Sequence, residues 1–307
     1  MGATVRTVLG DVSRAEVRAV VPHEHALLWQ DRSVSREAYL AQALPPFRRR
    51  MRAEFRRLLA RGCNCFVDCN TTGGLSIPEE LVAASEATGM HVVTATGFYV
   101  GRSLPGWAKR ASVDTLAERL LRDVRDGIGG TTARAGALKA ASNTYELSPV
   151  EQRTFLAVAQ VHRATGVPIT THTTKGARAH VDFFRSQRVD LERVALGHIE
   201  VDPWEDIVAV AREGVMFLFT NFGGKNILPE DMVIAQIADL VRRGCVGQIM
   251  ISVDMYLYYA KGRLRQRWPG GYVQLFDRVV PRLLKAGLKA SHVDRIMHEN
   301  PVRHLAF

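Results

Sequence analysis

The chain has 307 residues with a formal net charge of +10, and 47% of its residues are hydrophobic. This composition is typical of a globular protein with a sizeable core. No apolar run reaches the length of about 18 residues that a transmembrane helix needs, so no membrane partner is expected.

The N-terminus and the cysteines indicate the reducing interior of a cell. The first residues include Asp11 and Glu16 and lack an apolar core, so they do not resemble a secretory signal. Three of the four cysteines, Cys63, Cys65 and Cys69, are crowded together in a pattern that does not indicate a disulfide framework. Zinc sites usually place cysteines across a turn rather than along a strand, so we expect buried free thiols. We therefore predict a cytoplasmic protein.

Eight short β-like runs occur along the chain, and each is followed by a helical pattern. The runs are Arg18–His25, Cys63–Asn70, His91–Tyr99, Thr132–Ala140, Pro168–Thr173, Arg193–Ile199, Val215–Phe222 and Gln248–Asp254. One helix start, Ser148-Pro149-Val150-Glu151, combines an N-cap serine, a proline at the first position and a capping-box glutamate. Strands that alternate with helices indicate βα units and a parallel sheet. We predict an α/β protein, a (β/α)8 TIM barrel in which residues 1–307 form one domain.

The alternative α/β architecture is a doubly wound sheet, which needs a glycine-rich phosphate loop after its first strand. The first run ends in His23-Glu24-His25 instead. The glycines of Gly127-Ile128-Gly129-Gly130 do not open a helix with the dinucleotide-binding spacing, so we interpret them as loop glycines. The barrel is therefore the favoured architecture.

Side chains that bind metals fall at the ends of five of these runs. They are His23 and His25 in the first run, Lys139 in the fourth, His172 in the fifth, His198 in the sixth and Asp254 in the eighth. Two residues at i and i+2 share one face of a strand, and the carboxyl ends of barrel strands meet at one rim. Imidazole nitrogens and carboxylate oxygens are common metal ligands. The pattern predicts a metal site at the mouth of the barrel.

The segment Pro45–Arg61 carries many arginines, with apolar residues between them at helical spacing. The arginines are Arg48, Arg49, Arg50, Arg52, Arg56, Arg57 and Arg61. This pattern predicts an amphipathic helix with a basic face. We favour a solvated outer helix over a patch that binds a nucleic acid or a membrane surface. No nucleic-acid-binding motif accompanies the segment, so no nucleic-acid partner is expected.

Several motifs of the chain occur together in one known family. They are Pro22-His23-Glu24-His25, the stretch from Gly127 to Lys139, Thr171-His172-Thr173, Leu196-Gly197-His198, Ile251-Ser252-Val253-Asp254 and Glu299-Asn300-Pro301. In this combination the chain resembles the phosphotriesterase family of the amidohydrolase superfamily, which includes phosphotriesterase-like lactonases and related esterases. The resemblance covers essentially the whole chain, and the motifs are specific jointly rather than singly.

The resemblance implies a site with two divalent metal ions. The implied ligands are His23, His25 and Asp254 on the buried ion, His172 and His198 on the exposed ion, and Lys139 between them as a carbamate formed with carbon dioxide. Zinc is the first expectation for the metal, and cobalt, manganese and iron accept the same ligands. A lysine near cations loses its proton more readily, and the neutral amine can react with carbon dioxide.

The mechanism that the resemblance implies begins with a hydroxide that bridges the two metal ions and attacks the substrate. Asp254 takes the proton of this hydroxide. Tyr99, at the end of the third run, matches a tyrosine that lines the family pocket. It would donate a hydrogen bond to the substrate, or it would only pack there.

The chain departs from the family lactonases after its last two strands. Thr220-Asn221-Phe222 stands where they often have Asp-Arg-Tyr, which argues against an acyl-homoserine type of lactonase. Basic residues occupy the loops that should form the pocket: Lys225, and then Lys261, Arg263, Arg265 and Arg267 interleaved with aromatic residues. We predict that Lys225, Tyr256, Arg263 and Arg265 bind an anionic or polar substrate. A solvated loop is the open alternative.

We predict a metal-dependent hydrolase that cleaves a carboxylic ester or lactone of a small molecule. A phosphotriester or amide hydrolase on the same site is the alternative, because a metal-activated hydroxide and a Lewis acid serve carbon and phosphorus equally. A different alternative is a catalytically silent metal-binding barrel that holds a polyanion on its basic helix. The oligomeric state stays open, although barrels of this family commonly pair as homodimers.

Overall fold

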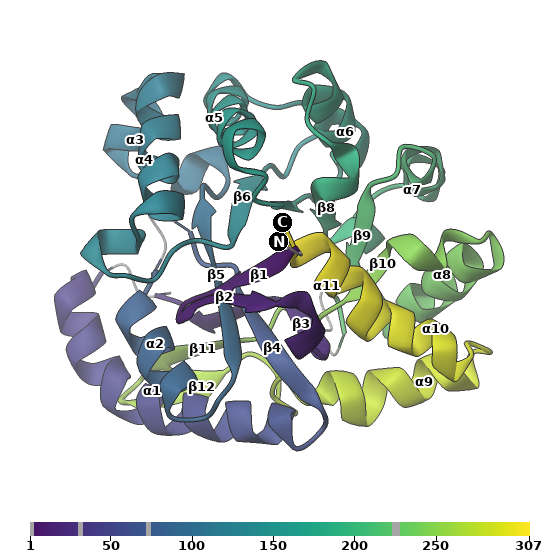
Figure 1. Ribbon diagram of the computed structural model, residues 1–307, viewed down its shortest axis with the longest axis horizontal. Helices are drawn as coiled ribbons and strands as arrows, with labels where there is room; N and C mark the ends of the chain where they lie inside the picture. Colours follow the sequence, from purple (N-terminus) through teal and green to yellow (C-terminus); the bar gives the residue numbers. More distant parts are fainter. Residues whose placement is uncertain (1–2, 30–32, 72–74, 223–227) are drawn as a thin grey trace.

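The computed structural model describes residues 3–29, 33–71, 75–222 and 228–307, and in it a barrel of parallel strands is surrounded by helices (Figure 1). The barrel strands are β3 (Ala19–Leu27), β4 (Cys63–Asp68), β5 (His91–Gly97), β6 (Ala137–Ala141), β7 (Ile169–His172), β8 (Val194–Gly197), β9 (Met216–Phe219) and β10 (Ile249–Ile251). The helices are α1 (Arg36–Leu59), α2 (Pro78–Glu86), α3 (Gly106–Arg110), α4 (Val113–Arg125), α5 (Pro149–Thr165), α6 (Ala177–Ser186), α7 (Trp204–Ala211), α8 (Glu230–Arg242), α9 (Val280–Lys285), α10 (Ala290–Asp294) and α11 (Asn300–Leu305).

The order of the strands confirms the predicted (β/α)8 fold. From β3 to β10, each strand pairs in parallel with the next one along the chain. All eight predicted runs contain a strand, although the fourth begins at Ala137 rather than Thr132. One detail differs from the predicted pattern, because a hairpin lies between β10 and the helical segment that follows it. Its strands β11 (Tyr256–Ala260) and β12 (Arg263–Gln266) are rich in aromatic and basic residues, and β11 pairs with β3.

A buried side chain joins β3 to the segment after β10, where the barrel closes. The carboxylate of Glu24 accepts hydrogen bonds from the Ser252 hydroxyl (2.7 Å) and from the backbone N–H groups of Val253 (2.9 Å) and Met255 (2.6 Å). The N–H of His23 donates to the Ser252 hydroxyl oxygen (3.0 Å). Glu24 therefore connects β3 to the segment after β10 through side-chain hydrogen bonds, at the place where the barrel closes.

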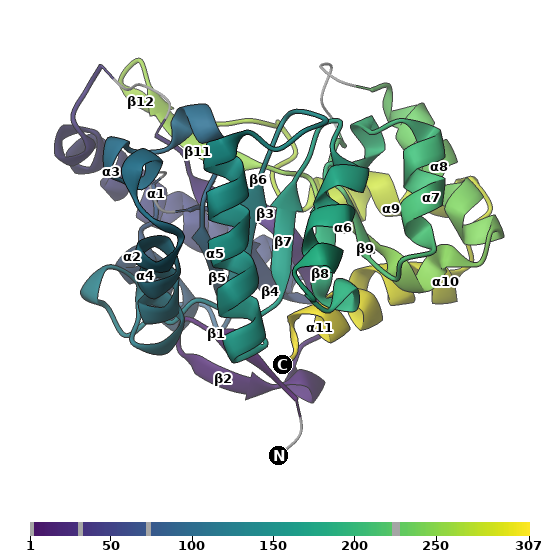
Figure 2. The ribbon, with the colours of Figure 1, turned by 90° about the horizontal axis from the view of Figure 1, so that it is seen from above.

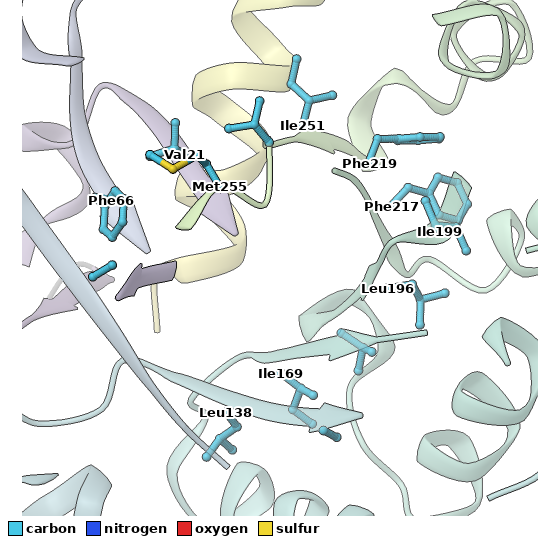
Figure 3. Packing of buried hydrophobic residues seen from close by; sticks show 14 of the residues in the cluster. Val21, Phe66, Leu138, Ile169, Leu196, Ile199, Phe217, Phe219, Ile251 and Met255 are labelled. Carbon is cyan, nitrogen blue, oxygen red and sulfur yellow. The ribbon is translucent and has the colours of Figure 1, made fainter. Parts of the chain in front are cut away.

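Apolar side chains fill the barrel on both faces of its strands. Phe66 of β4, Leu138 of β6 and Phe217 of β9 belong to the large cluster between strands and helices (Figure 3). Inside the barrel, a second cluster contains Cys65 and Cys69, and all four cysteines are free thiols, as predicted. The hairpin of β1 (Thr4–Thr7) and β2 (Gly10–Ser13) lies with α11 at the end of the barrel opposite the β11–β12 hairpin (Figure 2).

Helix α1 has the predicted amphipathic pattern and begins earlier, at Arg36, after the N-cap Ser35. Its apolar residues Phe47, Met51 and Phe55 are buried. Several of its arginines form ion pairs: Arg48 with Glu80, and Arg50 and Arg57 with Glu54. Arg61, just beyond the end of the helix, pairs with Asp277. Among the described residues, no helix is both long enough and apolar enough to cross a membrane.

Because Glu24 connects the two ends of the barrel sheet, substituting it tests how much this contact contributes to the free energy of unfolding. Replacing it in Glu24→Ala leaves three buried donors without an acceptor, so we expect the free energy of unfolding to fall by about 3 kcal/mol or more. Glu24→Gln keeps one acceptor oxygen and should lose less. Glu37→Ala, at an exposed position of α1, is the control. Denaturant unfolding measures all three, and a Glu24→Ala midpoint equal to that of the control would show that Glu24 does not hold the barrel closed.

Candidate metal centre

The six predicted metal ligands gather at the carboxyl ends of the barrel strands. His25, Lys139, His172, His198 and Asp254 line a cavity of about 380 Å³, and His23 is fully buried. The other described lining residues are Leu28, Trp29, Cys69, Asn70, Thr71, Leu75, Tyr99, Ser103, Leu104, Tyr256 and Arg267. The structure thus brings together side chains from strands that are far apart in the sequence.

The candidate ligands lie close to one another. His23, His25 and Asp254 each present one donor atom within 4.8 Å of the others. The rings of His172 and His198 have their centroids 4.4 Å apart, and the ring of His198 lies 5.0 Å from that of His23. The group formed by His23, His25 and Asp254 therefore lies next to a pair of imidazoles, those of His172 and His198.

Lys139 is unusual because its amine is buried among these groups. Its side chain is 2% exposed, and Nζ lies 3.0 Å from Nε2 of His23. Burial lowers the pKa of Lys139, which favours the neutral amine. Strand β5 passes Lys139 at Gly97, where a Cβ atom would lie 2.1 Å from the Lys139 carbonyl oxygen. At Gly197 of β8, a Cβ atom would lie 3.1 Å from Cε1 of His23.

Two imidazoles are oriented by asparagines that follow neighbouring strands. Nδ1 of His25 lies 2.9 Å from Oδ1 of Asn70, which follows β4, and Nε2 of His172 lies 2.9 Å from Oδ1 of Asn143, which follows β6. Because an amide oxygen only accepts, Nδ1 of His25 and Nε2 of His172 are the donors in these two contacts. The sequence offered no signal for either asparagine beyond a polar residue close behind a strand.

His198 is oriented by a chain of two further buried residues. Its Nδ1 lies 2.5 Å from Oγ1 of Thr220, and this hydroxyl lies 3.2 Å from a carboxylate oxygen of Glu200. The N–H of Thr220 also donates to Glu200 (3.2 Å). Burial raises the pKa of Glu200 to about 7, against the lowering effect of these hydrogen bonds. Sequence analysis noted Thr220 only as a departure from the lactonase pattern and did not identify Glu200.

Burial and neighbouring charges shift the pKa values of four candidate ligands. Burial lowers the pKa of His23 and His172 well below the usual value, and that of His198 to about 4. Burial alone would raise the pKa of Asp254, but its hydrogen bond with His25 and the positive groups nearby hold that pKa well below its usual range. Uncharged imidazoles and an ionised carboxylate are the forms that bind metal ions.

Two candidate ligands have a backbone conformation that is rare for residues other than glycine. His198 has φ of 62° and Asp254 has φ of 48°, both in the left-handed region. Such a conformation costs on the order of 1 kcal/mol or more and persists where the surrounding structure imposes it. Both residues lie just beyond the end of a strand, so the strained backbone turns these two side chains at the rim of the cavity.

Tyr99 lies in the cavity, where sequence analysis placed it. Its hydroxyl is 3.2 Å from Nε2 of His172, and the two rings are packed edge to face with their centroids 4.8 Å apart. Burial raises the pKa of Tyr99 to about 12, so the hydroxyl keeps its proton at neutral pH. A protonated phenol at this position is able to donate a hydrogen bond.

The predicted substrate-binding residues separate into three groups. Tyr256 lines the cavity, as expected, and Lys225 lies outside the described residues. Arg263 and Arg265 belong to β12 and are not among the described lining residues; Arg265 lines a separate groove against α1. The hairpin carries these two arginines away from the metal centre, so we no longer assign them to the substrate. Arg267, just after β12, lines the cavity instead.

The fold, the cavity and the comparisons agree on the class of protein. Residues 3–305 match the model of the phosphotriesterase family, so the chain belongs to that family. It is an enzyme, a hydrolase, of a family that depends on metal ions and acts on small molecules.

Known relatives of this chain have different activities. It is 29% identical to a phosphotriesterase homology protein of Escherichia coli, over 70% of this chain and 74% of the relative. It is 23% identical to the N-acetyltaurine hydrolase of Homo sapiens, over 100% and 99% of the two chains. Among solved structures, an organophosphorus hydrolase from Deinococcus radiodurans is similar with a TM-score of 0.88 and 27% identity, over 99% of this chain and 97% of the other. A mutant of a phosphotriesterase-like lactonase from the same organism also has a TM-score of 0.88, with 26% identity, over 98% of this chain and 100% of the other.

The contact between His198 and Thr220 predicts an effect on metal binding. In Thr220→Val the hydroxyl is lost while the shape is kept, so the ring of His198 is no longer fixed. We expect metal affinity to fall about 10- to 100-fold, as is usual when such a supporting group is removed. Thr220→Ser keeps the hydroxyl and is the matched control. Competition with a chromogenic chelator measures the affinity, and equal affinities for the valine and serine variants would contradict the prediction.

Proposed function

We propose that this protein is a dinuclear metal-dependent hydrolase that cleaves a carboxylic ester or lactone in a small, anionic substrate. The observation that carries the proposal is the gathering of six candidate ligands around one cavity, with donor atoms of His23, His25 and Asp254 within 4.8 Å of one another. Scattered histidines and a lone aspartate would satisfy their own local contacts. A cluster of this composition is suited to divalent cations.

The residues present fit such a metal pair. Imidazole nitrogens and a carboxylate are the donor set that divalent cations such as zinc prefer, and Nε2 of His23 lies 3.0 Å from Nζ of Lys139. His23, His25 and Asp254 would hold one ion, and His172 and His198 the other. Zinc is our first choice, and cobalt, manganese and iron accept the same donors.

Lys139 would join the two ions as a carbamate. Its burial beside His23 favours the neutral amine, which is the form that reacts with carbon dioxide. The carbamate would offer two hard oxygen atoms in place of the amine nitrogen. This change suits a position that is surrounded by imidazoles.

In the reaction, two bound cations would supply a Lewis acid and lower the pKa of water. Asp254, held as a carboxylate, is placed to accept the proton that the water loses. The hydroxyl of Tyr99 would donate a hydrogen bond to the substrate oxygen, because its high pKa keeps the proton in place. The apolar residues Leu28, Leu75 and Leu104 would exclude bulk water from one side of the cavity.

Amide hydrolysis is a second candidate, because the relative from Homo sapiens that matches the whole chain is an N-acetyltaurine hydrolase, named for an amide substrate. Phosphotriester hydrolysis remains a third alternative, and the organophosphorus hydrolase from Deinococcus radiodurans is the relative that supports it. The silent barrel with a polyanion on α1 has less support, because Arg48, Arg57 and Arg61 are engaged by acidic side chains.

Metal content and turnover test the proposal together. We expect about two metal ions per chain after reconstitution with bicarbonate, and hydrolysis within a panel of esters, lactones, amides and phosphotriesters. Removing a ligand in His23→Ala or Lys139→Ala should lower both metal content and turnover, whereas His292→Ala, in α10 far from the cavity, should change neither. Elemental analysis and initial rates are the measurements. A folded protein that binds no metal after reconstitution would refute the proposal.

A further inference from the structure

The guanidinium of Arg267 is fixed at the wall of the cavity. Its Nη1 donates to the backbone oxygen of Asp254 (3.3 Å) and to the carboxylate atom Oδ2 of the same residue (2.5 Å). The guanidinium carbon lies 4.5 Å from the ring centroid of Trp268 and 5.3 Å from that of Tyr256. Two aromatic faces and an ion pair therefore hold this cation in one orientation.

We propose that Arg267 selects the substrate by binding a carboxylate or sulfonate group that lies only a few bonds from the bond to be cleaved. This inference rests on the proposed hydrolase function, and it adds the residue and the position of the negative charge. Arg263 and Arg265 of the same hairpin were the predicted substrate contacts, but Arg267 is the arginine that lines the cavity among the described residues.

The charges of the cavity wall support this role. Among the described lining residues, the lysine and arginine side chains are Lys139 and Arg267. Lys139 is buried against His23 and would lose its charge as a carbamate, whereas Arg267 is 23% exposed at the side chain and stays charged. Leu28 and Leu104 contribute apolar wall. A negative group in this cavity would have one permanent cation to bind among the described residues.

The guanidinium also has donors to offer. Among the described residues, its hydrogen bonds all come from Nη1 and all reach Asp254. An arginine has five N–H groups in a planar fork, so Nη2 and Nε remain able to bind an oxyanion. A carboxylate and a sulfonate share the oxygen geometry that suits this fork.

The position of Arg267 limits where the substrate can carry its charge. One oxygen of the Asp254 carboxylate lies 3.3 Å from Nε2 of His25, and the other contacts Arg267. A single carboxylate therefore separates the guanidinium from the candidate metal ligands. A negative group on Arg267 must be close to the reacting bond, so a substrate with a long spacer would place its charge beyond the reach of this residue.

Turnover by the metal-loaded enzyme tests the proposal with matched substrates. The anionic esters are acetoxypropanoate and acetoxyethanesulfonate, the neutral ester is propyl acetate, and acetoxyhexanoate carries its charge on a longer spacer. N-acetyltaurine and neutral N-propylacetamide form the corresponding amide pair. In Arg267→Gln, we expect kcat/KM for the short anionic substrates, relative to the neutral ones, to fall about 10- to 100-fold. Arg265→Gln, on the same hairpin but outside the cavity, should leave this ratio unchanged.

Different outcomes separate specificity from a purely structural role. If Arg267 acts only by holding Asp254, then Arg267→Gln will slow charged and neutral substrates equally, and the proposal is overturned. It is also overturned if acetoxyhexanoate is as sensitive to the substitution as acetoxypropanoate. A preference for the sulfonate over the carboxylate, or the reverse, identifies which of the two groups the site is built for.

Binding provides a readout that does not need turnover. Calorimetry on the metal-loaded protein compares propanesulfonate with its neutral isostere, methyl propyl sulfone. We expect the sulfonate to bind more tightly, and the difference to shrink at least about tenfold in Arg267→Gln. Equal affinities in the wild-type protein would refute the role of Arg267 without any variant. Tight sulfonate binding that depends on Arg267, in a protein that hydrolyses none of the substrates, would support this inference and refute the proposed reaction instead.

Discussion

The carboxylate of Glu24 is the contact on which the geometry of the cavity depends. It binds the N–H groups of Val253 and Met255, the residues on either side of Asp254, and it lies in β3 next to His25. The same side chain that closes the barrel therefore fixes the distance between Asp254 and the histidines of β3. The left-handed backbone at Asp254 is held in place by these neighbours, so the strain is supported by barrel closure.

The charges around the cavity follow from where water is excluded. Deep in the barrel mouth, burial lowers the pKa values of His23, His172 and His198 and favours the neutral amine of Lys139. Nearer the entrance, Arg267 is partly exposed, stacked on aromatic rings and permanently charged. The cavity thus combines a floor of neutral nitrogen donors and the Asp254 carboxylate with one fixed positive charge at its wall, and this arrangement favours cations at the bottom and an anionic substrate above them.

Strand ends were predictable from the sequence, whereas side-chain partners were not. His23, His172 and Asp254 could be placed at one rim because strand periodicity and barrel topology fix where strand ends meet. Asn143 and Thr220 were missed because their role depends on which neighbouring strand lies beside them, and a single sequence does not give that distance. Arg263 and Arg265 were predicted in a loop over the pocket, whereas they belong to β12 and are not among the described residues that line the cavity.

The residues that hydrogen-bond to the imidazoles lie close to the strand ends, and this position separates the metal centre from the longer connections of the barrel. Asn70 holds His25, Asn143 holds His172 and Thr220 holds His198, and each of these partners stands immediately behind a strand rather than far out in a loop. The longer connections beyond them can accumulate substitutions without disturbing the ligands. Substitutions in the connections can therefore change which substrate fits the cavity, while the imidazoles at its floor keep their orientation.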